Sequence, residues 1–155
     1  MAGASAPDVP APTPAVATVI AVTKEQLGKP YLYGAVGPDS FDSSGFTGYA
    51  YAAAGIALPR TAGEQYLAGP HPSLAHLQAG DLLFWATDLS NVSTIDHMAM
   101  YLGAGLMIVA PHTGDVVKIL KAYANGYFGA TRVEPRVSGS VAAPQWSATG
   151  RAPGR

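Results

Sequence analysis

The 155-residue chain contains no cysteine, and only 12% of its residues are charged. The absence of cysteine excludes disulfides, zinc–thiolate sites and cysteine nucleophiles, although it leaves the cellular compartment open. The net charge is −1 and no basic patch carries interleaved aromatic residues, so nucleic acid is not an expected partner. No apolar run is long enough to span a membrane, and the histidines lack the spacing of metal ligands. We therefore expect no membrane span and no metal or other cofactor.

Hydrophobic residues make up 48% of the chain, which is enough for the core of one domain. Residues 1–15 are rich in alanine and proline and predict a flexible arm. Residues 138–155 are rich in glycine, serine, alanine and proline and predict a flexible tail. We expect one folded domain over residues 16–137, and we expect it to be a monomer. The N-terminus lacks the features of a signal peptide, so an exported protein would already have lost that segment.

The apolar pattern places helices before strands. It predicts a helix over residues 16–28, a second over 43–54 with Gly55 where a helix-ending glycine belongs, and a short third over 60–67. Short apolar segments joined by brief, often glycine-containing links then predict antiparallel strands. These segments are residues 82–86, 97–102, 106–110, 116–120 and about 130–135. The sequence thus predicts an α+β domain whose helices pack on an antiparallel sheet of five to six strands.

The segment DSSGF, residues 42–46, places Ser43 at the start of the second predicted helix. A helix N-terminus carries unpaired N–H groups and the positive end of the helix dipole, and cysteine enzymes use it to activate a thiol. A serine hydroxyl gains far less there, because its pKa is too far from neutral. Asp or Ser at this position is also a common helix cap, so the residues alone favour a cap over a nucleophile.

Other candidate residues lie in the segment PYLYGA and at the start of the strand 97–102. In PYLYGA, Tyr31 and Tyr33 can face the same side of an extended segment, either as half-buried aromatics or as donors to an oxyanion. His97 begins the strand, where a single histidine is more often structural than catalytic. Both interpretations of these residues stay open at this point.

Five segments, in order, resemble the NlpC/P60 family of bacterial cell-wall peptidases, and within it the exported Rip group and its catalytically degenerate type. The segments are GKPYLYGA, FDSSGF, IALPRTAGEQ, LQAGDLLFW and HMAMYLGAGLMIVAP. The resemblance implies a papain-like fold, in which a helix with the nucleophile packs on an antiparallel sheet with the base. It also implies a secreted or cell-wall protein whose partner is peptidoglycan. The family typically cleaves the stem peptide between D-glutamate and meso-diaminopimelate.

When the family pattern is carried over residue by residue, its nucleophilic cysteine falls on Ser43 and its base on His97. The polar residue that orients the base falls on Val109, and the tyrosine of the oxyanion pocket falls on Tyr31. Serine is a far weaker nucleophile than a thiolate, and valine offers no acceptor to the histidine ring. Loss of the orienting role costs about 10⁴ in rate in serine proteases, so the resemblance predicts a degenerate triad in a pseudoenzyme.

The resemblance therefore favours a module that binds the stem peptide in a groove without cutting it. The predicted binding residues are Tyr31, Tyr33, Asp42, Ser44 and Arg60. A helix N-terminus suits a carboxylate or a carbonyl. We predict that Arg60 either pairs with a stem carboxylate at the rim or is an ordinary solvated charge.

Two alternatives stay open. The first is an endopeptidase that is weak with Ser43, or that an engineered Cys-to-Ser change has inactivated. Since Val109 departs from the pattern as well, a naturally degenerate site is favoured over an engineered one. The second is an interaction domain that recruits other cell-wall hydrolases through its tails. His112 and Asp115 lie beyond Pro111, outside the strand register, so neither is expected to replace the orienting residue.

Overall fold

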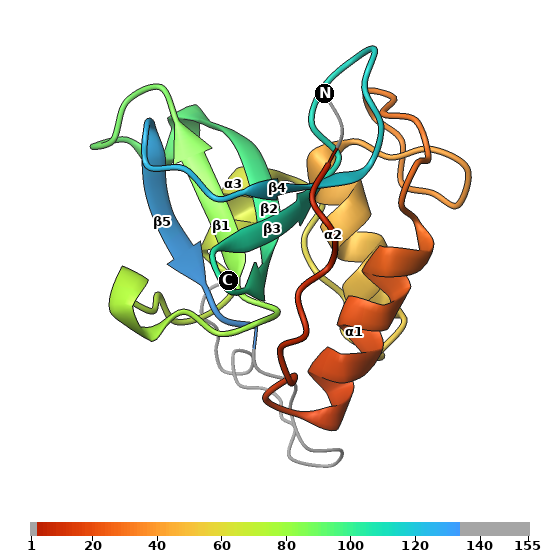
Figure 1. The fold of residues 1–155 in the computed structure, drawn as a ribbon. Helices are drawn as coiled ribbons and strands as arrows, with labels where there is room; N and C mark the ends of the chain where they lie inside the picture. Colours follow the sequence, from red (N-terminus) through yellow and green to blue (C-terminus); the bar gives the residue numbers. More distant parts are fainter. Residues whose placement is uncertain (1–2, 134–155) are drawn as a thin grey trace.

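The computed structural model describes residues 3–133 and shows helices packed on a single antiparallel sheet (Figure 1). The helices come first along the chain, as predicted, and the α+β architecture is confirmed. The α-helices are α1 (Pro14–Glu25), α2 (Ser43–Ala52) and α3 (Ala62–Tyr66), and the short 3-10 helices are η1 (Leu74–His76) and η2 (Val92–Thr94). The strands are β1 (Leu82–Ala86), β2 (Ile95–Gly103), β3 (Leu106–Val109), β4 (Lys118–Lys121) and β5 (Tyr127–Thr131).

The sheet has the order β4-β3-β2-β1-β5, and every neighbouring pair is antiparallel. The first four strands follow one another as hairpins, and β5 returns to pair with the other side of β1. In the β1–β2 ladder Trp85 lies opposite His97, and in the β2–β3 ladder Met100 lies opposite Ile108. This register fixes which side chains share a face of the sheet.

The two faces of the sheet support two apolar clusters, as the period-two geometry of strands requires. The face toward the helices forms the main core, together with residues of α1 and α2. Its buried side chains include Val19, Phe46, Leu82, Phe84, Met98, Met100 and Ile108. The opposite face carries a smaller cluster of Leu83, Trp85, Ala99, Met107, Val109 and Ala130. His97 is the partner of Trp85, so it belongs to this second face.

Local signals in the sequence explain where the first two helices begin. Thr13 caps α1 by accepting a hydrogen bond from the Val16 N–H at 3.1 Å, and Pro14 occupies the first turn, where its missing N–H costs nothing. Asp42 caps α2. Gly55 follows α2 with a φ of 80°, the left-handed conformation that glycine adopts without strain. In residues 3–133 no helix is both long and apolar enough to cross a membrane.

Several predicted boundaries need correction. α1 covers residues 14–25 rather than 16–28, α2 ends at 52 rather than 54, and the short third helix covers only 62–66. The fourth strand is 118–121 rather than 116–120. The last strand is 127–131 rather than 130–135, and it contains Gly129, a residue that argues against a strand in isolation. The predicted tail, residues 138–155, lies outside the described residues.

The N-terminal arm, described from residue 3, lies against the domain. The Ala4 N–H donates a 2.7 Å hydrogen bond to the Ile119 carbonyl of β4, and Ala11 packs against the main core. A Cβ on Gly103 would lie 2.7 Å from a methyl group of Val9, so the arm comes close to the β2–β3 turn. This segment of the predicted flexible arm therefore makes specific contacts with the sheet (Figure 1).

Candidate functional site

The N-terminal turn of α2 is built around the Asp42 carboxylate. Its Oδ1 accepts a 2.7 Å hydrogen bond from the Gly45 N–H, so the cap of α2 is Asp42 and not Ser43, the residue for which a cap was predicted. A Cβ at Gly45 would collide with the Ala35 carbonyl, so this position requires glycine. Ser43 is the first helical residue and is partly exposed. The structure thus places Ser43 where the sequence predicted, while Asp42 provides the cap.

Arg60 binds to this turn from the segment between α2 and α3. Its guanidinium donates to Asp42 Oδ2 at 2.7 Å, to Asp42 Oδ1 at 3.3 Å and to Ser44 Oγ at 2.8 Å. The Gly34 N–H also donates to Asp42 Oδ2 at 3.0 Å. Burial alone would raise the pKa of Asp42, but the hydrogen bonds from Arg60 and the Gly45 N–H outweigh it and hold that pKa below its usual value.

Arg60 is therefore not an ordinary solvated charge, because Asp42 pairs with its guanidinium while 45% of the side chain stays exposed. Its predicted contact with a stem carboxylate stays a prediction. An intramolecular pair of this kind orients the first turn of α2 and neutralises the Asp42 charge near Ser43. Any anionic ligand at this turn would meet a neutral ion pair rather than a single positive charge.

Gln65 supports the same turn from below, and sequence reasoning gave it no role. Its fully buried side chain donates to the Ser44 carbonyl at 3.0 Å and to the Pro59 carbonyl at 2.9 Å, and it accepts from Thr47 Oγ1 at 2.8 Å. Gln65 thereby ties α2, α3 and the segment between them together. The signal was present, because the segment IALPRTAGEQ ends on this residue.

His97 is the third residue of β2. The next residue, Met98, contacts α2, since Thr47 Oγ1 lies 3.7 Å from Met98 Sδ. The His97 ring lies 5.4 Å, centroid to centroid, from the ring of Trp85. Burial lowers the pKa of His97, the negative charge of Asp96 acts in the opposite direction, and His112 lowers the pKa further. His97 is therefore held toward its neutral form.

The three triad positions are not joined by hydrogen bonds. Within residues 3–133, neither the Ser43 hydroxyl nor either ring nitrogen of His97 has a hydrogen-bond partner. Val109 is 0% exposed and belongs to the same apolar cluster as Trp85, so it lies on the His97 face of the sheet. A side chain at position 109 could approach His97 from the neighbouring strand, but valine has no group that accepts a proton.

His112 and Asp115 do not replace that missing group in the described structure. His112 is 72% exposed, and its Nε2 lies 3.6 Å from Asp115 Oδ2, which is also 2.7 Å from the ammonium group of Lys118. His112 influences the pKa of His97 through space, but the described residues contain no hydrogen bond between the two rings. The prediction that these residues lie outside the strand register agrees with the end of β3 at Val109.

The two predicted tyrosines differ in environment. Tyr31 is half-buried and packs against the main core, and its backbone N–H donates to the Asp115 carbonyl at 3.0 Å. Burial and the nearby charge of Asp42 raise the pKa of Tyr31, so its hydroxyl keeps its proton and can act as a donor. Tyr33 is 86% exposed, and it lies close enough to Tyr31 and Arg60 to act on the pKa of both. Both tyrosines therefore lie near the Asp42–Arg60 pair, and their contact with a ligand stays a prediction.

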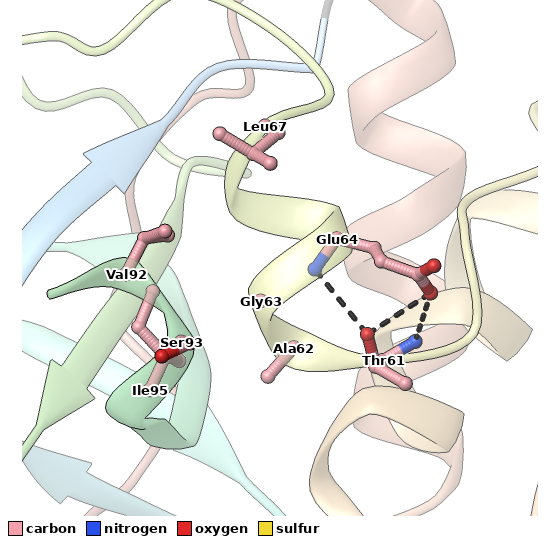
Figure 2. A pocket seen from close by; sticks show the side chains of 8 residues that line it. All are labelled: Thr61, Ala62, Gly63, Glu64, Leu67, Val92, Ser93 and Ile95. Carbon is pink, nitrogen blue, oxygen red and sulfur yellow. Dashed lines mark hydrogen bonds between the residues drawn. The ribbon is translucent and has the colours of Figure 1, made fainter. Parts of the chain in front are cut away.

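A cavity of about 370 Å³ lies between α3 and η2 (Figure 2). Its lining mixes apolar and polar side chains: Thr61, Ala62, Gly63, Glu64, Leu67, Val92, Ser93 and Ile95. The Glu64 carboxylate is held by Thr61, whose N–H and hydroxyl lie 3.3 and 3.0 Å from Glu64 Oε1. Val92 and Ser93 belong to η2, so the loop between β1 and β2 forms one wall of this cavity. None of the predicted site residues lines the cavity.

The described residues include no group of three or more His, Asp or Glu side chains that could hold a metal ion.

Comparison with known proteins gives consistent results. The model of the NlpC/P60 family matches residues 28–136. A gamma-D-glutamyl-L-lysine dipeptidyl-peptidase of Bacillus cereus is 40% identical over 128 residues, which cover 80% of this chain and 38% of that protein. A probable endopeptidase p60 of Listeria seeligeri is 44% identical over 96 residues, covering 62% of this chain and 18% of that protein. The chain thus spans less than half of these curated relatives.

Solved structures agree on the fold. An NlpC/P60 family protein from Bacillus cereus superposes with a TM-score of 0.73 at 37% identity, over 83% of this chain and 42% of that chain. RipD from Mycobacterium tuberculosis is described as a non-catalytic NlpC/p60 domain protein adapted to peptidoglycan binding. It superposes with a TM-score of 0.67 at 32% identity, over 79% of this chain and 99% of that chain. The peptidoglycan hydrolase RipB from the same organism superposes with a TM-score of 0.69 at 32% identity, over 79% of this chain and 66% of that chain. The resemblance to RipD is one among several.

Proposed function

Because the chain belongs to the NlpC/P60 family, we propose that it binds the stem peptide of bacterial peptidoglycan at the candidate site and does not cleave it. The observation that carries this proposal is the state of the triad positions. Ser43 has a hydroxyl without a base, and His97 has a ring without an orienting acceptor, since Val109 is apolar and buried. The scaffold of a peptidase is retained, whereas the proton transfers that peptide cleavage requires have no support.

The chemistry of acyl transfer explains why both departures matter. A serine attacks a carbonyl only if a base takes its proton, and the base works only if its second nitrogen is held by an acceptor. Loss of the orienting role alone costs about 10⁴ in rate in the worked serine-protease case. Replacing a thiolate by a neutral hydroxyl lowers the rate further, so the residual turnover would be negligible on the time scale of cell-wall remodelling.

Binding requires less than catalysis, and the site retains the groups for it. The first turn of α2 offers backbone N–H groups and the positive end of the helix dipole to a carbonyl or carboxylate of the stem peptide. The Tyr31 hydroxyl supplies a donor, and neutral His97 supplies one donor and one acceptor. The Arg60–Asp42 pair holds this turn in place without a net charge. Such a function places the protein at the cell wall, outside the membrane.

A second candidate is a weak endopeptidase that uses Ser43 and His97. The observation in its favour is that both side chains are present on the elements where the family places nucleophile and base. A version with an engineered Ser43 predicts that Ser43→Cys alone restores cleavage. Our proposal predicts that Ser43→Cys alone stays inactive, and that Ser43→Cys combined with Val109→His gains measurable turnover.

The two candidates are separated by co-sedimentation with purified insoluble peptidoglycan, followed by mass spectrometry of the supernatant. We expect the protein in the pellet and no released muropeptides. His97→Ala and Tyr31→Phe should weaken pelleting, and His76→Ala, an exposed histidine on η1, serves as the matched control. Released fragments that disappear in Ser43→Ala would support the endopeptidase, and a protein that stays in the supernatant would refute the binding proposal.

A further inference from the structure

The imidazole of His97 is held by an aromatic neighbour rather than by a hydrogen bond. Neither ring nitrogen has a partner among residues 3–133, so no polar contact in that range sets the orientation of the ring. Directly across the β1–β2 ladder lies Trp85, with ring centroids 5.4 Å apart and ring planes inclined by 46°. The separation is within the range of aromatic contacts, and the tilt lies between the stacked and the edge-on arrangements.

Trp85 is itself fixed on its remaining sides. The side chain is 4% exposed, and its Nε1–H donates to the Tyr123 carbonyl at 3.2 Å. The Tyr123 ring lies 4.9 Å from the indole, and the Tyr127 ring meets it edge-on at 5.8 Å. The indole nitrogen is thus already engaged and cannot bond to His97. What Trp85 offers His97 is a rigid apolar surface.

We propose that Trp85 is the positioning residue for His97, and that its indole fixes the imidazole where a polar residue at position 109 would otherwise orient it. A hydrogen bond to an orienting acceptor uses one ring nitrogen, whereas contact with an indole uses neither. His97 therefore keeps both nitrogens available, one as donor and one as acceptor. This part of the inference rests on the proposed function, because it assigns the two nitrogens to the stem peptide.

The charged groups around His97 are consistent with this arrangement. Asp96 precedes it on β2 and favours the charged ring, whereas His112, beyond the end of β3, disfavours it. Tyr123, from the loop after β4, lies close enough to Asp96 for its pKa to be raised by burial and then by that charge. Burial outweighs the attraction of Asp96, so the pKa of His97 is lowered and the ring is held toward its neutral form.

The test is an NMR titration of the His97 ring in the ligand-free protein, with the variants Trp85→Phe and Trp85→Leu. We expect Trp85→Leu to raise the pKa of His97 toward its ordinary value of 6.5 and to average its ring conformations. Trp85→Phe keeps an aromatic surface and should retain most of the wild-type behaviour. The matched control is Phe84→Leu, which removes a buried aromatic from the same strand but on the helix-facing side.

An unchanged His97 titration in Trp85→Leu, or the same shift in Phe84→Leu, would overturn the inference. If Trp85→Leu does not fold, nuclear Overhauser contacts between the Trp85 and His97 rings of the wild-type protein provide the test. Absence of these contacts would also overturn the inference. Because no ligand is present, this experiment stands apart from peptidoglycan binding. A protein that fails to pellet with peptidoglycan but shows the expected titration would refute only the proposed function.

Discussion

The two halves of the candidate site are held in different ways. The first turn of α2 is fixed by directional polar bonds, because Asp42, Ser44 and the backbone around them receive hydrogen bonds from Arg60 and Gln65. The start of β2 is fixed by packing, because His97 lies against Trp85 without a hydrogen bond in the described structure. The half that would carry the nucleophile thus keeps its precise geometry, while the half that would carry the base has lost its directional partner. Our proposal assigns to a site with this division the positioning of a ligand and not the transfer of a proton.

In the half of the site that is held by polar bonds, substitution of Asp42 should cause the largest loss of stability. Asp42→Ala removes the cap of α2 and leaves the Arg60 guanidinium without its carboxylate, so we expect a loss of about 2–3 kcal/mol in the free energy of unfolding. Asp42→Asn keeps the capping oxygen and should lose about 1 kcal/mol. Urea unfolding followed by circular dichroism measures both changes. Equal losses in the two variants would mean that the charge, and not the cap, carries the stability.

A double-mutant cycle between Asp42 and Arg60 sharpens the same point. Because the Arg60 side chain is 45% exposed, solvent weakens the ion pair, and we expect a coupling energy of about 1 kcal/mol. The cycle uses Asp42→Asn, Arg60→Gln and the double variant, with unfolding measured in urea. A coupling near zero would show that the two side chains are neighbours without energetic consequence.

The packed half should respond to pH instead. The lowered pKa of His97 means that the unfolded chain binds a proton more readily than the folded protein. The contribution of His97 to the free energy of unfolding is therefore fully present above its ordinary pKa of 6.5. It is lost as the pH falls from there through the lowered pKa of the folded protein. His97→Gln should remove this part of the pH dependence in unfolding measurements between pH 5 and 8. The same slope in His97→Gln and wild type would assign it to another group.

The smallest effect is expected at Ser43. Its hydroxyl has no partner within residues 3–133, so Ser43→Ala should change the free energy of unfolding by less than about 0.5 kcal/mol. Thermal unfolding of the two proteins measures this difference. A clear loss of stability would show that the hydroxyl contributes to the α2 turn and that Asp42 does not cap it alone.

Local signals were sufficient for the elements that position the site. The DSSG segment and Gly55 predicted both ends of α2 to within two residues, and the pattern around His97 predicted a strand. Those features depend on neighbours along the chain, and a sequence shows them directly. The resemblance to a family then assigned roles that no local pattern could have supplied.

Contacts between distant residues were missed. Arg60 and Asp42 are 18 positions apart and Gln65 and Ser44 are 21 apart, and neither periodicity nor propensity reports which polar groups meet across such intervals. The last strand was misplaced for a related reason. Gly129 lowers the strand propensity of residues 127–131, but a Cβ at this position would lie 3.3 Å from the Tyr66 ring, so tertiary packing explains the glycine.

The contact between the N-terminal arm and β4 bears on association between molecules. β4 is an outer strand of the sheet, and the unpaired carbonyl and N–H groups of such a strand are a template for pairing with a second chain. The Ala4 N–H occupies the Ile119 carbonyl, and a Cβ at Gly3 would lie 2.9 Å from the same oxygen. Residues 3 and 4 thus shield one end of the open edge. Removing them should raise the tendency of the protein to aggregate without altering the candidate site.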